Sequence, residues 1–178
     1  MIKIAISGPE STGKSMLSEA LAKTFNGILI PELAREYVEQ LSGPYTFEDV
    51  CTIAQRQISQ ELEIEQQNNK GFNFVFFDTD LIITKVWFIH RFAEIPEFLT
   101  ERMKQPFIDF HLLCSPDLEW IPDPVREHGT DRDYFFNWYE KEIQQTNKPY
   151  AIVRGVGEQR LNNAVNAIND FLQNYNKQ

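Results

Sequence analysis

The chain has 178 residues, with 17 Lys or Arg and 26 Asp or Glu, and its formal net charge at pH 7 is −9. Hydrophobic residues make up 42% and charged residues 24%, which is typical of folded globular domains and not of disordered chains. The acidic balance, with no stretch rich in Lys and Arg, excludes a nucleic-acid platform. Because the chain is acidic overall, any phosphate-bearing ligand must be held by a local site. At about 150 residues per domain, the length predicts a single domain over residues 1–178.

The cysteines and the apolar runs indicate in which cellular compartment the protein is expected. Cys51 and Cys114 form no CxxC pair and belong to no Cys/His cluster at metal-ligand spacing, so we expect reduced thiols in a cytoplasmic protein. The residues before Gly8 hold too few apolar side chains for a signal peptide, and no run approaches the ~20 apolar residues of a membrane span. We therefore expect no membrane partner and, because the chain starts at its first strand, no leading domain.

Strands and helices are predicted to alternate along the chain. Short apolar runs bounded by Gly, Pro or Asp predict strands, and apolar residues spaced three and four apart predict helices. In chain order we predict a strand at 2–7, a helix from about 13, a strand at 27–30, helices at 34–41 and from 46 to about 69, a strand at 72–77, helices through 87–88 and after 96, a strand at 107–114, a helix from 130 to about 145, a strand at 150–153 and a last helix through 161–175. This order is typical of an α/β fold, a five-stranded parallel sheet with helices on both faces joined by right-handed crossovers.

Two of the predicted helices begin with a capping signal. Thr46 with Asp49, and Thr130 with Asp133, have the three-residue spacing of a capping box. The first of these helices is rich in Gln and Glu, and we expect its polar face to be solvated. His111 falls within a predicted strand, where we expect a structural role.

Residues 8–15 carry the strongest motif in the sequence. They read Gly-Pro-Glu-Ser-Thr-Gly-Lys-Ser, a full match to the phosphate-binding pattern G-x-x-x-x-G-K-[ST], between a predicted strand and a predicted helix. In such a loop the backbone N–H groups and the helix N-terminus hold the β-phosphate, Lys14 reaches the β- and γ-oxygens, and the Ser15 hydroxyl is a ligand of Mg²⁺. A chance glycine-rich turn is the alternative. We predict a three-layer P-loop kinase fold with ATP and Mg²⁺ as cofactors, the nucleotide being held by Gly8, Glu10, Ser11, Thr12, Gly13, Lys14, Ser15 and Met16.

Acidic residues follow the second and third predicted strands. In an open parallel sheet, ligands lie beyond the carboxyl ends of the strands, so Glu32, Asp78 and Asp80 are expected near the phosphates. We predict that Asp78 serves the Mg²⁺ ion, directly or through water, and that Glu32 is the general base that accepts the proton of the attacking hydroxyl. The alternatives are that Asp78 or Asp80 caps the following helix, and that Glu32 is a surface acid paired with Arg35.

A long loop at about 115–132 is predicted to act as a lid. Its Arg126 and Arg132 are expected to close over the γ-phosphate, stabilise the charge on its oxygens and exclude water. Trp120, in the same loop, is a candidate to line the ligand pocket, and the turn at Gly155 is a candidate for contact with the adenine ring. A surface loop with two arginines and an ordinary strand-to-helix turn are the alternatives.

The sequence resembles the ribosylnicotinamide kinase domain of NadR-type proteins of NAD salvage, a family of P-loop small-molecule kinases. The resemblance covers nearly the whole chain, and the matching stretches are residues 8–15, Pro-Glu-Leu-Ala-Arg-Glu-Tyr-Val at 31–38, Gln55-Arg56, Asp-Thr-Asp at 78–80 with Thr84, and Glu119-Trp120 through Arg126 and Gly129. It implies transfer of the γ-phosphate of ATP to the 5′-hydroxyl of nicotinamide riboside, which gives nicotinamide mononucleotide. The substrate is then expected at Glu32, Arg35, Tyr37, Asp80 and Trp120.

Chemistry and family pattern agree on the substrate, with one departure. A pocket near the acidic residues Glu32, Glu36, Asp78 and Asp80, helped by an aromatic face, favours a cation such as the pyridinium of nicotinamide riboside. Asp123 is followed by Pro124 where the family usually has Asp-Gly, which bears on the flexibility of the lid. The nucleotidyltransferase domain of the family has no counterpart in this sequence.

Other functions stay open at this stage. One is a kinase of another nucleoside or small metabolite, and another is a regulatory P-loop ATPase or nucleotide-binding module. A guanine-specific switch is disfavoured because Asn-Lys-Pro-Tyr at 147–150 lacks the aspartate of an Asn-Lys-x-Asp motif.

Overall fold

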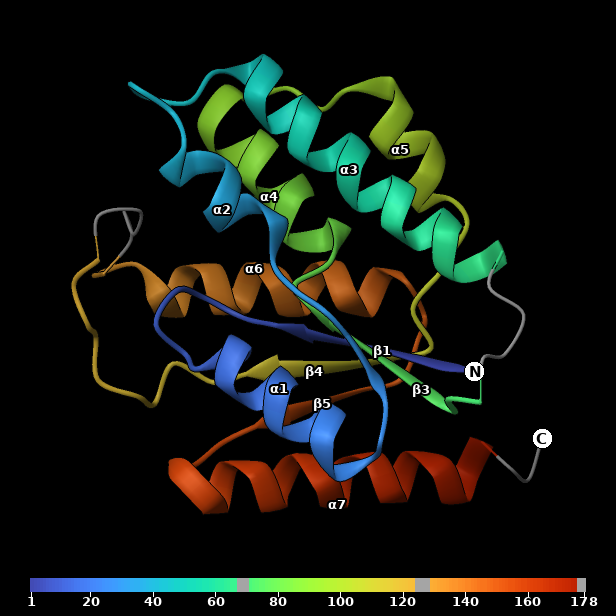
Figure 1. Cartoon of the computed structure of the whole chain (residues 1–178). Helices are drawn as coiled ribbons and strands as arrows, with labels where there is room; N and C mark the ends of the chain where they lie inside the picture. Colours follow the sequence, from blue (N-terminus) through green and yellow to red (C-terminus); the bar gives the residue numbers. More distant parts are fainter. Residues whose placement is uncertain (67–70, 124–128, 176–178) are drawn as a thin grey trace.

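The computed structural model describes residues 1–66, 71–123 and 129–175, and its centre is a parallel β-sheet (Figure 1). The strands are β1 (Ile2–Ser7), β2 (Ile28–Ile30), β3 (Phe74–Asp78), β4 (Phe110–Cys114) and β5 (Tyr150–Val153). They lie in the order β2-β3-β1-β4-β5, and every neighbouring pair is parallel. The predicted five-stranded parallel sheet is therefore confirmed, and β1 lies at its middle.

Helices cover both faces of the sheet. α1 (Lys14–Thr24) and α7 (Gly157–Tyr175) lie on one face, drawn below the sheet in Figure 1. The opposite face carries α2 (Leu33–Glu39), α3 (Phe47–Gln66), α4 (Leu81–Phe92), α5 (Glu97–Met103) and α6 (Arg132–Gln145). The three layers predicted from the alternating pattern are thus present.

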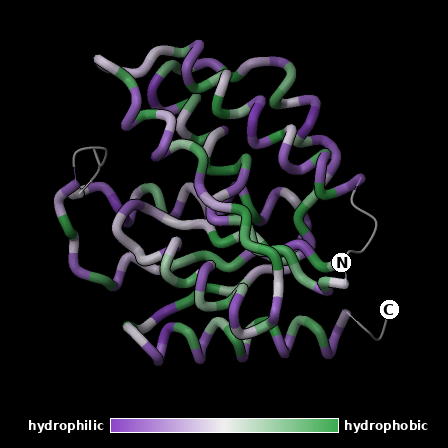
Figure 2. The backbone as a smooth tube through the Cα atoms, viewed as in Figure 1, coloured by the Kyte–Doolittle hydropathy of each residue, from purple (hydrophilic) through white to green (hydrophobic). Residues whose placement is uncertain are grey.

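The core on each face follows from the alternation of side chains along β1. Ile4 and Ile6 point toward α1 and α7 and belong to a buried cluster with Leu21 and Ile168. Ala5 points the other way, into a cluster under α3 that includes Phe77. Burying a side chain such as Ile4 completely stabilises the fold by roughly 1.5–3 kcal/mol. Figure 2 shows the same arrangement, with hydrophobic residues concentrated along the strands of the sheet.

One of the two predicted capping boxes forms and the other does not. The Asp49 carboxylate accepts from the Thr46 backbone N–H at 2.8 Å, and the Thr46 hydroxyl accepts from the Asp49 backbone N–H at 3.2 Å. The prediction for Thr130 with Asp133 is wrong, because α6 begins after Asp131 without a side-chain cap. There a hydrogen bond from Arg132 to the Leu118 carbonyl ties the start of the helix to the preceding loop. The predicted end of α3 near residue 69 lies outside the described residues.

β3 and β4 begin later than their apolar runs predict. β4 starts at Phe110, where pairing with Ile4 of β1 starts, although apolar residues extend back to Phe107. Phe107 and Ile108 are buried in the cluster under α3 without belonging to the strand. β3 likewise starts at Phe74, opposite Ile2 of β1. Hydrophobicity marks burial, whereas a strand extends only as far as its neighbour pairs with it.

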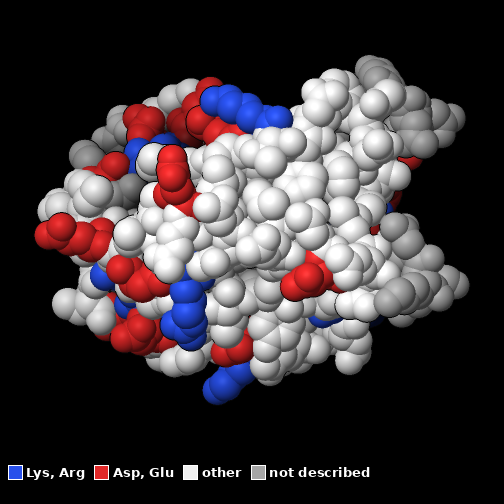
Figure 3. All heavy atoms as spheres, turned by 90° about the horizontal axis from the view of Figure 1, so that it is seen from below, with Lys and Arg blue, Asp and Glu red and all other residues white. Residues whose placement is uncertain are grey.

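The surface on the α7 side is mostly uncharged. In Figure 3, charged side chains gather toward the end of the molecule where α7 begins, and Lys and Arg lie among Asp and Glu. No helix in the described ranges is long and apolar enough to cross a membrane. Cys51 and Cys114 are both free thiols, and Cys114 is buried in β4.

Candidate functional site

The P-loop (residues 8–15) is folded back on its own backbone between β1 and α1. Gly8 and Gly13 have φ angles of 147° and 72°, which only glycine adopts readily. A Cβ atom on Gly8 would also come within 2.8 Å of a backbone carbonyl of β4. The Thr12 hydroxyl and the Lys14 ammonium both donate to the Pro9 carbonyl, at 2.8 and 2.9 Å. The residues of the motif therefore form a closed loop at the carboxyl end of the central strand.

The first turn of α1 faces this loop and is open to a ligand. α1 begins at Lys14, and no side chain caps its N-terminus. Its first backbone N–H groups have no intrahelical partner, and together with the helix dipole they suit a phosphate. Ser15 and Met16 are exposed in this turn, and Glu10 lies half-buried before it. The predicted nucleotide residues are thus brought together.

The P-loop also contacts the beginning of the predicted lid. The Ser11 hydroxyl donates to the Glu119 carbonyl at 3.3 Å and accepts from the Ile121 backbone N–H at 3.0 Å. A Cβ atom on Gly13 would meet Leu118 at 3.0 Å, so glycine is needed there for close packing as well. The segment around 118–121 therefore lies against the P-loop.

Asp78, the last residue of β3, is buried beside the P-loop. Its Oδ1 atom has no hydrogen-bond partner within the described part of the chain. Burial raises the pKa of Asp78, while a hydrogen bond from Ser15 and the charge of Lys14 lower it. A hydroxyl and a carboxylate with an unused oxygen suit Mg²⁺, which commonly takes one or two protein ligands and completes its shell with phosphates and water. The described residues contain no group of three or more His, Cys, Asp or Glu side chains arranged to hold a metal ion.

Glu32 lies at the carboxyl end of β2, at the N-terminus of α2. Its side chain makes no capping hydrogen bond. Burial raises the pKa of Glu32, and so do Asp78 and Glu10, whereas the charges of Lys14 and Arg35 lower it. The alternative that Glu32 is an acid paired with Arg35 is wrong. The Arg35 guanidinium instead donates to Glu39 at 3.0 Å and to Asp123 at 2.9 Å.

Asp80 is the cap of α4, as one of the alternatives predicted. Its Oδ1 accepts from the Ile82 backbone N–H at 3.2 Å and from the Ser7 hydroxyl at 3.3 Å. Its Oδ2 lies 3.2 Å from Nδ1 of the buried His111. Asp80 therefore joins the ends of β1 and β3 to β4, and His111 has the structural position expected for it.

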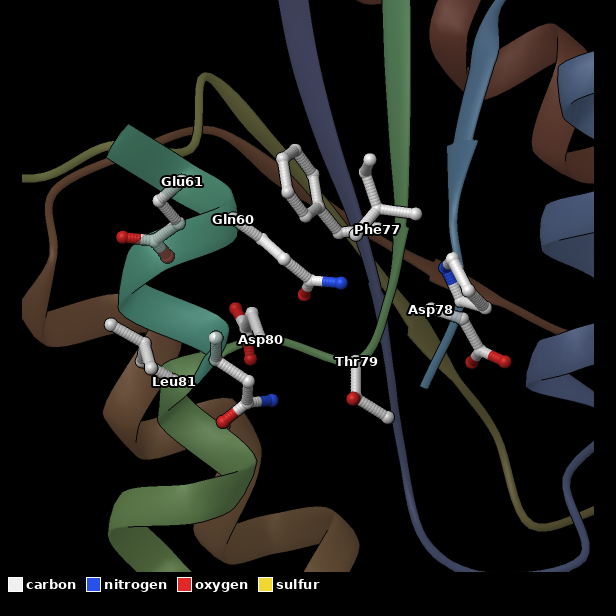
Figure 4. Close-up of a pocket in the computed structure, with 10 residues that line it drawn as sticks. Gln60, Glu61, Phe77, Asp78, Thr79, Asp80 and Leu81 are labelled. Atoms are coloured by element: carbon white, nitrogen blue, oxygen red, sulfur yellow. The ribbon is translucent and has the colours of Figure 1, made fainter. Parts of the chain in front are cut away.

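A pocket opens at the carboxyl ends of β2 and β3, under α3 (Figure 4). Residues of these strands and of the turn after β3 form one side, and α3 forms the other. They are Ile30, Pro31, Gln57, Gln60, Glu61, Phe77, Asp78, Thr79, Asp80 and Leu81. In Figure 4 the carboxylate of Asp78 points away from the side chains of Gln60 and Asp80. The pocket thus reaches Asp78 from the side of the sheet opposite α1.

The α3 residues of this pocket were missed by the sequence analysis, which expected a solvated polar face. Gln57 is buried and accepts a 2.6 Å hydrogen bond from the Thr84 hydroxyl. Glu61 is buried and pairs with Arg102 of α5 at 2.8 Å, and burial raises its pKa to about 7. The four-residue spacing of Gln57 and Glu61 places them on one helix face, which was the available signal.

Another missed residue is Tyr139 of α6. It is buried, and burial raises the pKa of its hydroxyl, as do the charges of Glu10, Asp80 and Glu32. An uncharged phenol therefore lies near the acidic groups of the site. The sequence offered only an aromatic residue on a helix, which is typical of ordinary core packing.

The remaining predicted residues lie around the edge of the site. Trp120 packs against Gly129, where a Cβ atom would come within 2.9 Å of its ring, and the Arg132 guanidinium lies 6.0 Å from the ring centroid. Tyr37 donates its hydroxyl to Asp49 at 2.9 Å. Arg126 lies outside the described residues.

Gly155 lies beyond the carboxyl end of β5. Its φ angle is 93°, which favours glycine. Its backbone N–H donates to the Asp117 carboxylate at 2.8 Å. The P-loop therefore has acidic residues of β2 and β3 on one side and the turn containing Gly155 on the other.

Known proteins share this sequence pattern and fold. Residues 3–160 match the family described as AAA domain. The trifunctional NAD biosynthesis/regulator protein NadR of Salmonella typhimurium is 24% identical over 159 residues, which are 85% of this chain and 38% of the relative. The crystal structure of NadR protein in complex with NR has a TM-score of 0.71 at 24% identity, covering 95% of this chain and 51% of that chain. Deoxyadenosine kinase from M. mycoides with bound dATP has a TM-score of 0.63 at 14% identity, covering 95% of this chain and 100% of that chain.

These similarities show that the chain has the fold of NadR and of the deoxyadenosine kinase, and they bear out the resemblance to the kinase domain of NadR. The chain spans 38% of the length of the curated NadR. The match over residues 3–160 shows that the chain belongs to the AAA domain family.

Proposed function

We propose that the protein is a Mg²⁺- and ATP-dependent kinase that phosphorylates the 5′-hydroxyl of nicotinamide riboside to give nicotinamide mononucleotide. The observation that carries this proposal is the convergence of two carboxylates on one lysine. The positive charge of Lys14 in the P-loop lowers the pKa of both Glu32, after β2, and Asp78, at the end of β3. A phosphate cradle, a group for a metal ion and a basic group are the parts that phosphoryl transfer requires.

In this proposal the P-loop holds the triphosphate, with Lys14 on the β- and γ-oxygens. Ser15 and Asp78 hold Mg²⁺, which would neutralise charge on the phosphates when it is bound. Glu32 accepts the proton of the acceptor hydroxyl as the hydroxyl oxygen bonds to the γ-phosphorus and the bond to ADP breaks. Because burial raises the pKa of Glu32, its carboxylate is a better proton acceptor than an ordinary surface glutamate.

The lid supplies positive charge in this proposal. Arg132 is held near the P-loop by its hydrogen bond to Leu118, so a small movement brings its guanidinium to the transferred phosphate. Arg126 is assigned the same role from the sequence. Closure of this segment excludes water, which otherwise would be phosphorylated in place of the substrate.

The pocket under α3, a cavity of about 10 Å³, is the proposed place where the acceptor binds once the site has widened around it. It is lined by Glu61 and Asp80, with the amides of Gln57 and Gln60 between them. The lining holds three carboxyl groups, Glu61, Asp78 and Asp80, of which Glu61 already pairs with Arg102. With no lysine or arginine among the lining residues, the remaining carboxylates favour a cation such as the nicotinamide ring of the proposed substrate. The name of the NadR relative and the NR bound to a protein of the same fold support this substrate.

A kinase of another nucleoside is the second candidate. This chain is matched over 95% of its length by the whole of a deoxyadenosine kinase chain. A nucleoside kinase of this fold therefore needs no further domain, and its acceptor need not carry a charge.

The test is a panel of acceptors offered with Mg-ATP. It includes nicotinamide riboside, its uncharged dihydro form, adenosine, deoxyadenosine and cytidine, with product detection by mass spectrometry. We expect a 5′-phosphate of nicotinamide riboside and little product from the dihydro form, which has a similar shape but no positive charge. Turnover of deoxyadenosine alone would replace the substrate by the second candidate, and ADP without any phosphorylated acceptor would refute the kinase.

A further inference from the structure

The helix that carries Glu32 at its N-terminus, α2, is held only weakly by packing. None of the residues of α2 is buried. The strand before it, β2, has three residues, all of them half-buried, and lies at an edge of the sheet. Burial of an apolar face is what fixes most helices in a protein. The position of Glu32 therefore depends to a large extent on polar contacts of α2.

Polar side chains supply such contacts on two sides of α2. Toward α3, the Tyr37 hydroxyl donates to Asp49 at 2.9 Å, and the Arg56 guanidinium lies 5.2 Å from the centroid of the Tyr37 ring. Toward the loop after β4, the Arg35 guanidinium donates to the Asp123 carboxylate at 2.9 Å. This second contact, which we call the Arg35–Asp123 bridge, joins residues that are 88 positions apart in the chain.

The loop that Arg35 reaches is itself attached to the P-loop. Two residues before Asp123, the Ile121 backbone N–H donates to the Ser11 hydroxyl at 3.0 Å. The same hydroxyl donates to a carbonyl of this loop at 3.3 Å. A series of contacts therefore runs from the phosphate site through the loop to Arg35, which lies three positions after Glu32.

The charge of Arg35 is already neutralised within the protein. One of its terminal nitrogens binds Glu39 at 3.0 Å, and the other binds Asp123 at 2.9 Å. The family resemblance implied that Arg35 contacts the substrate, but a cationic acceptor gains nothing from a neighbouring arginine. We propose instead that Arg35 is a positioning residue, whose bridge to Asp123 fixes α2 relative to the P-loop and so places Glu32 for phosphoryl transfer. This inference rests on the proposed function for the role of Glu32.

The bridge affects the rate more than the stability of the fold. A general base must lie within hydrogen-bond reach of the proton that it accepts. Displacing a reacting group by about 1 Å can lower the rate by about 10²-fold. A partly exposed ion pair, by contrast, contributes little to the stability of the whole protein. We therefore expect loss of the bridge to lower kcat while the fold and the ATP site are kept.

The first experiment breaks the bridge from either side and measures kcat and the Kd for Mg-ATP. Arg35→Met keeps the aliphatic stem and removes the guanidinium, and Asp123→Ala removes the carboxylate. In each variant we expect kcat, with nicotinamide riboside or with whichever nucleoside of the panel is turned over, to fall at least about tenfold, and the Kd for Mg-ATP to stay within about twofold. Glu39→Ala is the matched control, because it removes the other partner of Arg35 and leaves the bridge in place. We expect neither value to change in this control.

Double variants separate positioning from direct contact with the substrate. Because both residues act through one bridge, Arg35→Met combined with Asp123→Ala should be no more impaired than either single variant. In a Glu32→Gln background, breaking the bridge should lower kcat no further. Losses that multiply in either combination would overturn the inference. A loss in Arg35→Met alone, with a raised KM for the acceptor, would overturn it too and make Arg35 a substrate ligand.

Hydrogen exchange of α2 tests the bridge without reference to activity. In Asp123→Ala we expect the backbone amides of residues 33–39 to exchange about tenfold faster than in the wild type, and in Glu39→Ala to stay within about twofold. Thermal unfolding checks that each variant is folded. Unchanged exchange in both Asp123→Ala and Arg35→Met would overturn the inference. Wild-type protein that phosphorylates no acceptor would overturn the proposed function, and the catalytic role of the bridge with it, whereas the exchange result would still decide whether the bridge holds α2.

Discussion

Asp78 and Asp80 are two residues apart, and their carboxylates face opposite sides of the sheet (Figure 4). Asp78 lies near Ser15 and Lys14 at the start of α1 and keeps one oxygen without a partner among the described residues. Asp80 caps α4 and has accepted hydrogen bonds from Ser7 and Ile82. One aspartate is therefore available to a ligand, and the other holds strands and a helix together.

This difference predicts opposite effects for two similar substitutions. Asp78→Asn is expected to raise the Mg²⁺ concentration needed for half-maximal activity by at least about tenfold, because an amide is a weaker ligand than a carboxylate. The same variant is expected to keep or increase its stability, since burial of the carboxylate is relieved. Magnesium titrations of activity and thermal unfolding measure the two effects.

Asp80→Asn is expected to lower the free energy of unfolding instead, by about 0.5–1.5 kcal/mol, because an amide oxygen is a weaker acceptor than a carboxylate and the contact of the carboxylate with His111 is lost. Its Mg²⁺ requirement is expected to match that of the wild type. Denaturant unfolding and the same magnesium titration check this. If Asp80→Asn raised the Mg²⁺ requirement as much as Asp78→Asn does, the assignment of the ion to Asp78 would be wrong.

Lys14→Ala is expected to reduce kcat/KM for ATP by at least about 10²-fold, because the charge that faces the β- and γ-oxygens is lost. Steady-state kinetics with varied ATP measures this loss. Lys23→Ala is the matched control, since Lys23 is exposed in the last turn of the same helix. An equal loss in both variants would point to damage to α1 rather than to the phosphate site.

Glu32→Gln is expected to reduce kcat by roughly 10²–10⁴-fold while leaving the Kd for ATP nearly unchanged, since general-base catalysis contributes that much and the amide cannot accept the proton. The pH profile gives an independent readout. Because the pKa of Glu32 is raised, and the base must be deprotonated to act, kcat of the wild type should fall on acidification at a pH above the usual carboxyl range. An unchanged acidic limb in Glu32→Gln would show that another group titrates.

The burial of Glu61 predicts a pH dependence of stability, although its partner Arg102 opposes the effect. The pKa of Glu61 is raised from 4.5 to about 7 by burial, so the folded state binds its proton more tightly than the unfolded state does. Between these two pH values the unfolded state has lost the proton and the folded state has not, and stability therefore falls as the pH rises through this window. Glu61→Gln should flatten the decrease. Denaturant unfolding at several pH values from 4.5 to 8 measures it, and an identical slope in the variant would contradict the assignment to Glu61.

Local patterns were sufficient for much of the architecture. The motif at 8–15, the strand before it and the helix after it were predicted, and so was the capping box of Thr46 with Asp49, because each depends on hydrogen bonds and side-chain spacing within a few residues. The first residue of α6 was not predicted correctly, because it depends on the hydrogen bond from Arg132 to Leu118, which lies fourteen positions earlier in the chain. The start of β4 depends in the same way on where β1 offers a partner.

By itself, the sequence determined that this is an α/β protein with a phosphate-binding loop and acidic residues at the strand ends, since periodicity and short motifs are properties of neighbouring residues. Only the tertiary structure decided which of these acids faces the loop. It also decided that Gln57 and Glu61 of a polar helix line a pocket, and that Arg35 and Asp123 join α2 to the loop after β4. Burial and pairing of this kind arise when segments distant in the chain pack together, and the composition of each segment alone carries no record of its partner.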